Sequence, residues 1–221
     1  MKQPVSIAYT AIGIVFCTSL LIANLFATKL ILIGPYTATA ALLVFPITYI
    51  ANDCLAEIWG FARARFVIVT GLVISMAFVI FSTIAVALPS PSFWPHQSAF
   101  EYVFGLAPRI TIASLCAFFV GSILNAYVMS RMKTQYGLSR EAFSARAILS
   151  TIIGETADSV VFYPIAFWGL VPMSELVVLM LVQVTLKTVY EIVFLPVTIR
   201  IVNRLRHYEN TVHTTFCSSK A

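Results

Sequence analysis

Charged side chains inside apolar stretches are the residues of this chain best suited to chemistry. Five of the nine acidic residues and three basic ones lie in segments apolar enough to cross a membrane: Asp53, Glu57, Glu155, Asp158, Glu191, Lys29, Arg109 and Lys187. A charge at the centre of a bilayer costs about 2.5–3.5 kcal/mol on insertion scales. Charges kept at that cost predict a polar cavity or pathway between helices, in which carboxylates accept hydrogen bonds or hold a cation.

Glu155 and Asp158 form the deepest acidic pair. Residues three apart share one face of a helix. Counted from Arg146 at about 1.5 Å per residue, they lie about 13 and 18 Å into the membrane, near the middle of a core about 30 Å thick. Small neighbours such as Gly154 leave room for a ligand or for close helix packing. The alternative is a protonated or ion-paired couple with a structural role.

Asp53 and Glu57 form a second pair, spaced four residues apart near the end of their predicted helix. They either line the inner part of a pathway or form an interfacial pair that reaches water beside Trp59.

Lys187 and Glu191 share the same spacing midway along the last apolar stretch. Lys187 either pairs with Glu191 or neutralises the acids of the preceding helix. Gln183 lies one turn before Lys187 on the same face, where its amide can bind a polar ligand.

Three further residues complete the predicted binding site. Arg109 lies just inside the end of its apolar stretch, where it either extends to the interface or contributes to the cavity. Asn24 lies deeper in the first stretch and can hydrogen-bond across helices or to a ligand. Phe162 follows Asp158 by one turn and is the best candidate to stack on a planar ligand.

The composition defines the class of protein. The 221 residues are 60% hydrophobic and only 10% charged, against about 25% charged in soluble domains. This predicts an all-α polytopic membrane protein with one domain over 1–221 and membrane lipid around it. The basic residues behind the net charge of +5 are dispersed, so no nucleic-acid partner is expected. The four cysteines form no CxxC pair and the histidines lie outside the apolar stretches, so no metal or cofactor is expected.

The hydrophobic pattern predicts six transmembrane helices, because a span needs about 20 apolar residues. The predicted spans cover about 6–33, 37–59, 65–88, 108–130, 147–169 and 174–202. Residues 89–103 are predicted as an interfacial loop with a short amphipathic turn around 99–104. Lys and Arg occur in alternate connections, and such residues are retained on the cytoplasmic side. Both termini are therefore predicted to be cytoplasmic.

Several segments, in this order, resemble the queuosine precursor transporter family, also called the vitamin uptake transporter family. They are Asn24…Lys29, Asp53-x-x-x-Glu57-x-x-Gly60, Phe100…Phe104-Gly105…Pro108-Arg109, Ser150-Thr151…Gly154-Glu155…Asp158-Ser159…Phe162 and Lys187…Glu191…Pro196. The resemblance covers roughly residues 20–205. One region departs from it: the family pattern leads us to expect Gln near Ser122 and an acid at Asn125.

The resemblance implies a bacterial inner-membrane protein that imports 7-deazaguanine precursors of the tRNA base queuosine for salvage. The candidate substrates are the cyano and aminomethyl precursors, queuine and its nucleoside. The resemblance also implies a distant likeness to the substrate-binding subunits of energy-coupling-factor vitamin transporters. For such a ligand, Glu155 and Asp158 are predicted to bind the donor edge or an amine. Lys187 or Gln183 is predicted to bind the carbonyl.

Two alternatives stay open. One is the binding subunit of a multi-component importer, which needs a partner ATPase because this chain has no GxxxxGK[ST] phosphate loop. The other is an intramembrane aspartyl enzyme built on Asp53 and Asp158, but the chain lacks GxGD, HExxH and GxSxG motifs. We therefore expect a transporter and not an enzyme. The sequence leaves open whether it forms a homo-oligomer or uses an energising partner.

Overall fold

The computed structural model describes residues 6–136 and 140–218. It divides into two compact units, each described here by itself. The first comprises Met1–Ala23, Leu43–Ser75 and Tyr190–Ala221, and the second comprises Asn24–Leu42 and Met76–Val189.

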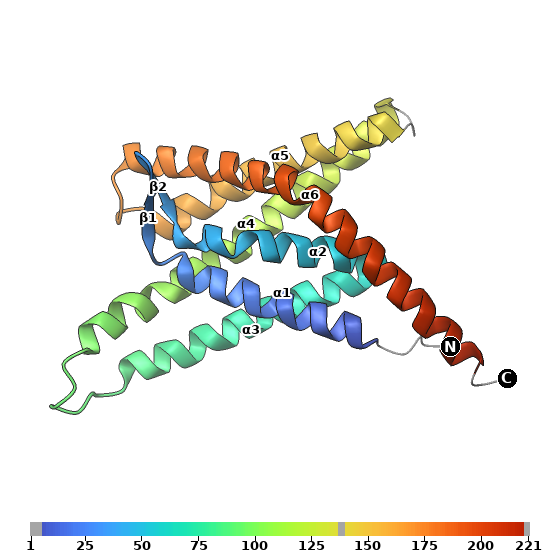
Figure 1. Ribbon diagram of the computed structural model, residues 1–221. Coiled ribbons are helices and arrows are strands. Elements are labelled where there is room, and N and C mark those ends of the chain that lie inside the picture. The colour runs from blue at the N-terminus through green and yellow to red at the C-terminus, as the bar shows by residue number, and fades with distance from the viewer. Residues whose placement is uncertain (1–5, 137–139, 219–221) are drawn as a thin grey trace. The chain divides into compact units, whose positions relative to one another are not determined.

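The described chain is mostly helical, as predicted (Figure 1). Its elements are α1 (Ile7–Phe26), β1 (Leu30–Ile33), β2 (Tyr36–Thr39), the 3₁₀ helix η1 (Ala40–Leu43), α2 (Phe45–Trp59), α3 (Phe61–Ala87), α4 (Gln97–Tyr136), α5 (Arg140–Phe167) and α6 (Met173–Ser218).

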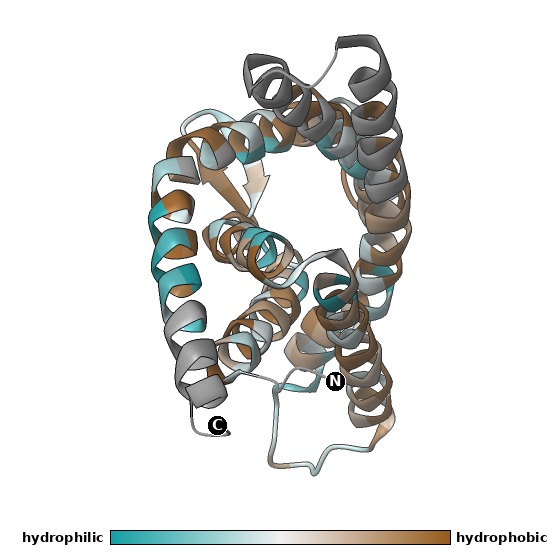
Figure 2. Cartoon of the chain, turned by 90° about the vertical axis from the view of Figure 1, so that its right-hand side faces the viewer, coloured by the Kyte–Doolittle hydropathy of each residue, from teal (hydrophilic) through white to brown (hydrophobic). Residues whose placement is uncertain are grey.

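Hydrophobic helices of spanning length confirm a polytopic membrane protein. Within the described residues, four segments are long and apolar enough to cross a bilayer: Ile7–Phe26, Ala62–Ala87, Gln97–Gly121 and Met173–Phe194. Figure 2 shows hydrophobic residues over most of the helices and hydrophilic residues on the part of α6 that leads to the C-terminus. The predicted spans at 37–59 and 147–169 correspond to α2 and α5, which are not among the four, so six spans stay a prediction.

A β-hairpin corrects the predicted boundary between the first two spans. The prediction of helix up to residue 33 and again from residue 37 is wrong, because α1 ends at Phe26 and β1 pairs antiparallel with β2. Gly34 makes the reversal with a φ of +61°, which costs glycine little. Apolar length alone does not separate a buried strand from a helix. The β-branched residues and the Gly-Pro pair here favour the hairpin.

The start of α4 also differs from the prediction. Residues 97–103, expected in the loop, belong to α4, which continues through Pro108. Gln97 Nε2 donates to the Val86 carbonyl at 3.2 Å, and the rings of Phe100 and Phe104 lie 4.4 Å apart between centroids. These contacts stabilise an early helix start. Membrane helices tolerate an internal proline because neighbouring groups satisfy the freed carbonyl. Helices α5 and α6 likewise extend beyond their predicted bounds, beginning at residue 140 and ending at residue 218, respectively.

The first unit has an apolar core made by α1, α2 and α3. Its buried members are Phe16, Ala51, Leu55, Ala64 and Val67. The Tyr9 hydroxyl donates to the Arg63 carbonyl at 3.1 Å, which ties the start of α1 to α3.

The second unit depends on close packing of α4 against α5, which run side by side (Figure 1). Buried small residues recur every four positions on α4, at Ala113, Ala117 and Gly121. A Cβ atom at Gly121 would lie 3.0 Å from the Gly154 carbonyl oxygen and 3.2 Å from the Asp158 Cβ. Small residues at this spacing let two membrane helices approach closely, and the approach fixes the segment of α5 that carries Glu155 and Asp158.

Candidate functional site

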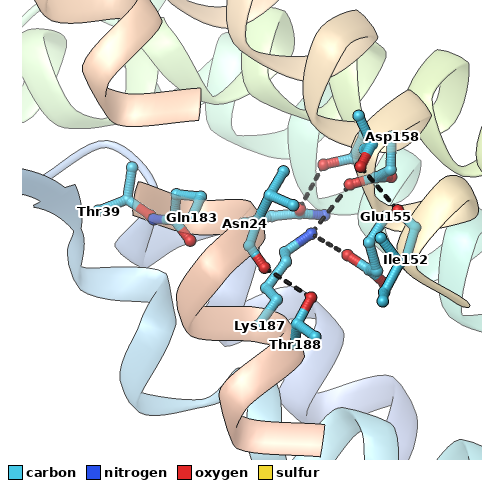
Figure 3. Close-up of polar contacts among 11 residues, drawn as sticks. Asn24, Thr39, Ile152, Glu155, Asp158, Gln183, Lys187 and Thr188 are labelled. Carbon is cyan, nitrogen blue, oxygen red and sulfur yellow. Dashed lines mark hydrogen bonds and ion pairs between the residues drawn. The ribbon is translucent and has the colours of Figure 1, made fainter. Parts of the chain in front are cut away.

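A buried ion cluster lies between α5 and α6 in the second unit. Lys187 Nζ is 2.9 Å from Glu155 Oε2 and 2.9 Å from Asp158 Oδ2. The exposed fractions of the three side chains are 8% for Lys187, 18% for Glu155 and 27% for Asp158. Figure 3 shows the lysine from α6 pointing at both carboxylates of α5. Lys187 therefore pairs with the acids of the preceding helix, one of the two alternatives that its spacing left open.

The helical spacing explains why one ammonium reaches both acids. Glu155 and Asp158 are three residues apart on α5, so both project from the same face. Two carboxylates and one ammonium carry one negative charge in excess. Breaking a buried pair by removing one partner typically costs about 3–5 kcal/mol, so removing Lys187 or one of the acids is expected to weaken the contact between the two helices.

Gln183 extends the polar surface by one turn of α6. Its side chain is fully buried, and its Nε2 donates to Thr39 Oγ1 at 2.9 Å. Its Oε1 is buried and has no hydrogen-bond partner among the described residues. A buried acceptor without a partner costs about 1–3 kcal/mol, so this oxygen is suited to a donor from a ligand.

Asn24 at the end of α1 provides another polar atom of the second unit. Ser114 Oγ on α4 donates to Asn24 Oδ1 at 2.7 Å. The Asn24 Nδ2 is buried and finds no partner within the described part of the chain. Asn24 thus makes the interhelical hydrogen bond that was one of its two predicted roles, and its amide N–H groups stay available to an acceptor.

Phe162 lies in an aromatic cluster on α5. It is half-buried, and its ring centroid lies 5.1 Å from that of Tyr163 and 6.2 Å from that of Phe167, both edge to face. These contacts hold the ring one turn beyond Asp158.

Arg109 makes a structural contact at the end of α5. Its Nε donates to the Ile165 carbonyl and its Nη2 to the Trp168 carbonyl, both at 2.6 Å. The last carbonyls of a helix have no partner within the helix, and a cation there also opposes the helix dipole. Gly169 follows with a φ of +79°, as is common just past a helix end. The guanidinium thus links α4 to the end of α5.

The acids of α2 belong to the first unit. Arg206 Nη2 on α6 lies 2.6 Å from Glu57 Oε1, and their side chains are 50% and 62% exposed, respectively. Asp53 is exposed one turn earlier on α2. The Glu57–Arg206 pair matches the interfacial alternative for Glu57. The side chains of Glu191, Ser122 and Asn125 lie outside those that the structure describes.

Sequence reasoning missed four residues that the structure brings into this polar region. Thr39 and Ser114 hydrogen-bond Gln183 and Asn24, respectively. Tyr163 is 3% exposed, and its ring stacks on that of Phe167 with 5.8 Å between centroids. Ser159 is fully buried, and its Oγ has no partner among described residues. Serine and threonine are common in membrane proteins, so neither residue type stands out in a sequence. Ser159 could have been noticed only because it follows the acid at position 158, and the sequence holds no comparable signal for Thr39.

Known proteins resemble the chain over most of its length. A family model described as "Putative vitamin uptake transporter" matches residues 39–201. A probable queuosine precursor transporter of Bacillus subtilis is 27% identical over 176 residues, covering 79% of this chain and 76% of the relative. The queuosine precursor transporter of Escherichia coli is 28% identical over 124 residues, covering 56% of this chain and 52% of the relative. A probable one of Haemophilus influenzae is 28% identical over 133 residues, covering 60% and 53%, respectively. The chain thus matches about half the length of the last two.

No solved structure shows significant similarity to the chain. The family match nonetheless covers well over half of the sequence and includes Thr39, the ion cluster of α5 and α6, and Gln183. The family description and the relatives' names denote transporters, which confirms the expectation of a transporter over an enzyme. The chain belongs to the vitamin uptake transporter family.

Proposed function

We propose that this chain imports 7-deazaguanine precursors of queuosine across the bacterial inner membrane for salvage into tRNA. The three relatives named as queuosine precursor transporters support this substrate class. Because these relatives are themselves named transporters, they favour transport by this chain over a role as the binding subunit of a multi-component importer.

The observation that carries the proposal is the buried cluster of Glu155, Asp158 and Lys187. A 7-deazaguanine presents a ring N–H and an exocyclic amine on one edge and a carbonyl beside them. One carboxylate accepts the two donors, and Lys187 donates to the carbonyl. Hydrogen bonds to charged groups are roughly twice as strong as neutral ones. The excess negative charge also suits the ammonium of an aminomethyl precursor.

The other predicted residues take supporting roles in this proposal. Phe162 stacks on the heterocycle, and Asn24 and Gln183 supply amide contacts at its periphery. Asp53, Glu57 and Glu191, which belong to the first unit, stay predicted substrate-binding residues. Arg109 holds the end of α5 and so acts on the site indirectly.

The proposed architecture is one membrane domain with six spans and both termini in the cytoplasm, related to the substrate-binding subunits of energy-coupling-factor transporters. The basic residues in alternate connections support this topology.

An uptake assay in cells tests the function. The host is a bacterial strain that neither synthesises nor imports queuosine precursors, and it carries either the chain or an empty vector. We expect queuosine in tRNA only in cells that express the chain and receive a precursor in the medium. If every precursor leaves tRNA queuosine at the level of the empty vector, while the protein is present in the membrane, the proposal is wrong.

A further inference from the structure

The hydrogen bond between Gln183 and Thr39 joins two fully buried side chains of the second unit. The two residues are 0% and 1% exposed, and the Nε2 to Oγ1 distance is 2.9 Å. They come from distant parts of the sequence: Thr39 ends β2, and Gln183 lies on α6 one turn before Lys187 (Figure 3). The hairpin thus places a hydroxyl against an amide on the face of α6 that also carries the ion cluster.

Thr39 is held firmly enough to orient a partner. It pairs with Leu30 in the two-stranded ladder, and the residue is 1% exposed. A threonine hydroxyl has one proton and two lone pairs. One lone pair of Thr39 Oγ1 accepts from Gln183 Nε2, so the amide turns its NH₂ group toward Thr39.

The opposite end of the amide is then determined. Gln183 Oε1 is buried, and no described residue donates to it. An amide held in this way presents an acceptor, whereas a freely rotating amide presents either an acceptor or a donor. The contact therefore selects which hydrogen-bonding edge of a ligand is recognised.

We propose that Thr39 is a positioning residue that fixes Gln183 Oε1 as an acceptor for an N–H of the transported heterocycle. This rests on the proposed import of 7-deazaguanines and assigns Gln183 to the donor edge of the ligand, which leaves the ligand carbonyl to Lys187. The predicted specificity is for heterocycles with an exocyclic amine beside the ring N–H. A site built around a buried acceptor rejects a ligand that lacks the matching donor, because the acceptor is then left unpaired.

Competition for uptake tests the proposal. Labelled aminomethyl precursor is supplied together with unlabelled 7-deazaguanine or with 7-deazahypoxanthine, which lacks the exocyclic amine. The measured quantity is the ratio of their inhibition constants. We expect wild type to favour 7-deazaguanine by roughly tenfold, the effect of one or two hydrogen bonds. Thr39→Val should bring the ratio near one, and Thr39→Ser, which keeps the hydroxyl, should preserve it.

A double substitution separates positioning from general damage. In a Gln183→Leu background the amide is absent, so Thr39→Val should leave the already reduced ratio unchanged, as expected for residues that act through one contact. A further fall of the ratio in the double variant would overturn the proposal. So would a wild-type ratio preserved in Thr39→Val or in Gln183→Leu. If Thr39→Val fails to reach the membrane, Gln183→Leu alone decides.

The assay also distinguishes this inference from the proposed function. No uptake of any precursor by wild type contradicts the function itself. Uptake by wild type with equal inhibition by the two heterocycles leaves the function standing and removes the role of Thr39 and Gln183.

Discussion

Lys187 Nζ lies 2.9 Å from one carboxylate oxygen of Glu155 and 2.9 Å from one of Asp158, so the ammonium is shared equally by the two acids. The two ionised carboxylates carry one more charge than the ammonium of Lys187. A ligand that brings two N–H donors or an ammonium would complement that charge. We therefore predict that the cluster binds ligands of this kind.

Neutral isosteres of the two acids test this reasoning. We predict that Asp158→Asn and Glu155→Gln each lower precursor uptake at least tenfold, because each replaces a charge-assisted acceptor by a weaker one. The measurement is initial uptake rate, normalised to the amount of protein in the membrane. Glu175→Gln is the matched control, since Glu175 is exposed near the start of α6. Near-normal uptake in both acid variants would remove these residues from the site.

At the scale of elements, the length of the apolar stretches predicts the helices. It does not predict where the first helix ends or where α4 begins. The strands of the hairpin over residues 30–39 are also largely apolar, so a hydropathy pattern alone does not separate them from a helix. The deciding features are local: β-branched residues and Gly34 in a left-handed conformation. The contact of Lys187 with the acids of α5 was predictable as one of two alternatives from spacing alone. The contact of Thr39 with Gln183 was not, because 144 residues separate them.

The contact of α4 with α5 gives a prediction about stability. Gly121→Ala would put a methyl group 3.0 Å from the Gly154 carbonyl oxygen, so the backbone of α5 would have to give way by a few tenths of an ångström. Overpacking of this kind costs about 1–3 kcal/mol. We expect a lower midpoint of thermal unfolding in detergent and reduced uptake, since the same segment carries Glu155 and Asp158.

Gly105→Ala is the control on the same helix. A Cβ atom at Gly105 meets nothing within 4 Å, and alanine favours a helix over glycine by about 1 kcal/mol. This variant should unfold at an equal or higher temperature than wild type. If Gly121→Ala is as stable as Gly105→Ala, the close approach of the two helices is not needed for stability.

At the scale of the whole molecule, the charges predict the topology more firmly than helix lengths do. Helix α2 has only 15 residues, below the usual length of a span, yet the residues before it are hydrophobic and include the hairpin. The hairpin pairs only the facing edges of β1 and β2, so its outer edges need cover from other parts of the protein within a membrane. We predict that residues 30–59 cross the membrane as a hairpin followed by a short helix, which keeps an even number of crossings.

Reporter fusions test this crossing. We predict that a green fluorescent protein fused after residue 221 is fluorescent, which requires a cytoplasmic location. Alkaline phosphatase fused after residue 96 should be active, which requires the opposite side, because residues 89–96 contain no Lys or Arg. Alkaline phosphatase fused after Arg63 should be inactive if residues 30–59 cross the membrane. Activity of that last fusion would mean that the hairpin and α2 return to the side from which they entered, and the count of six spans would then be wrong.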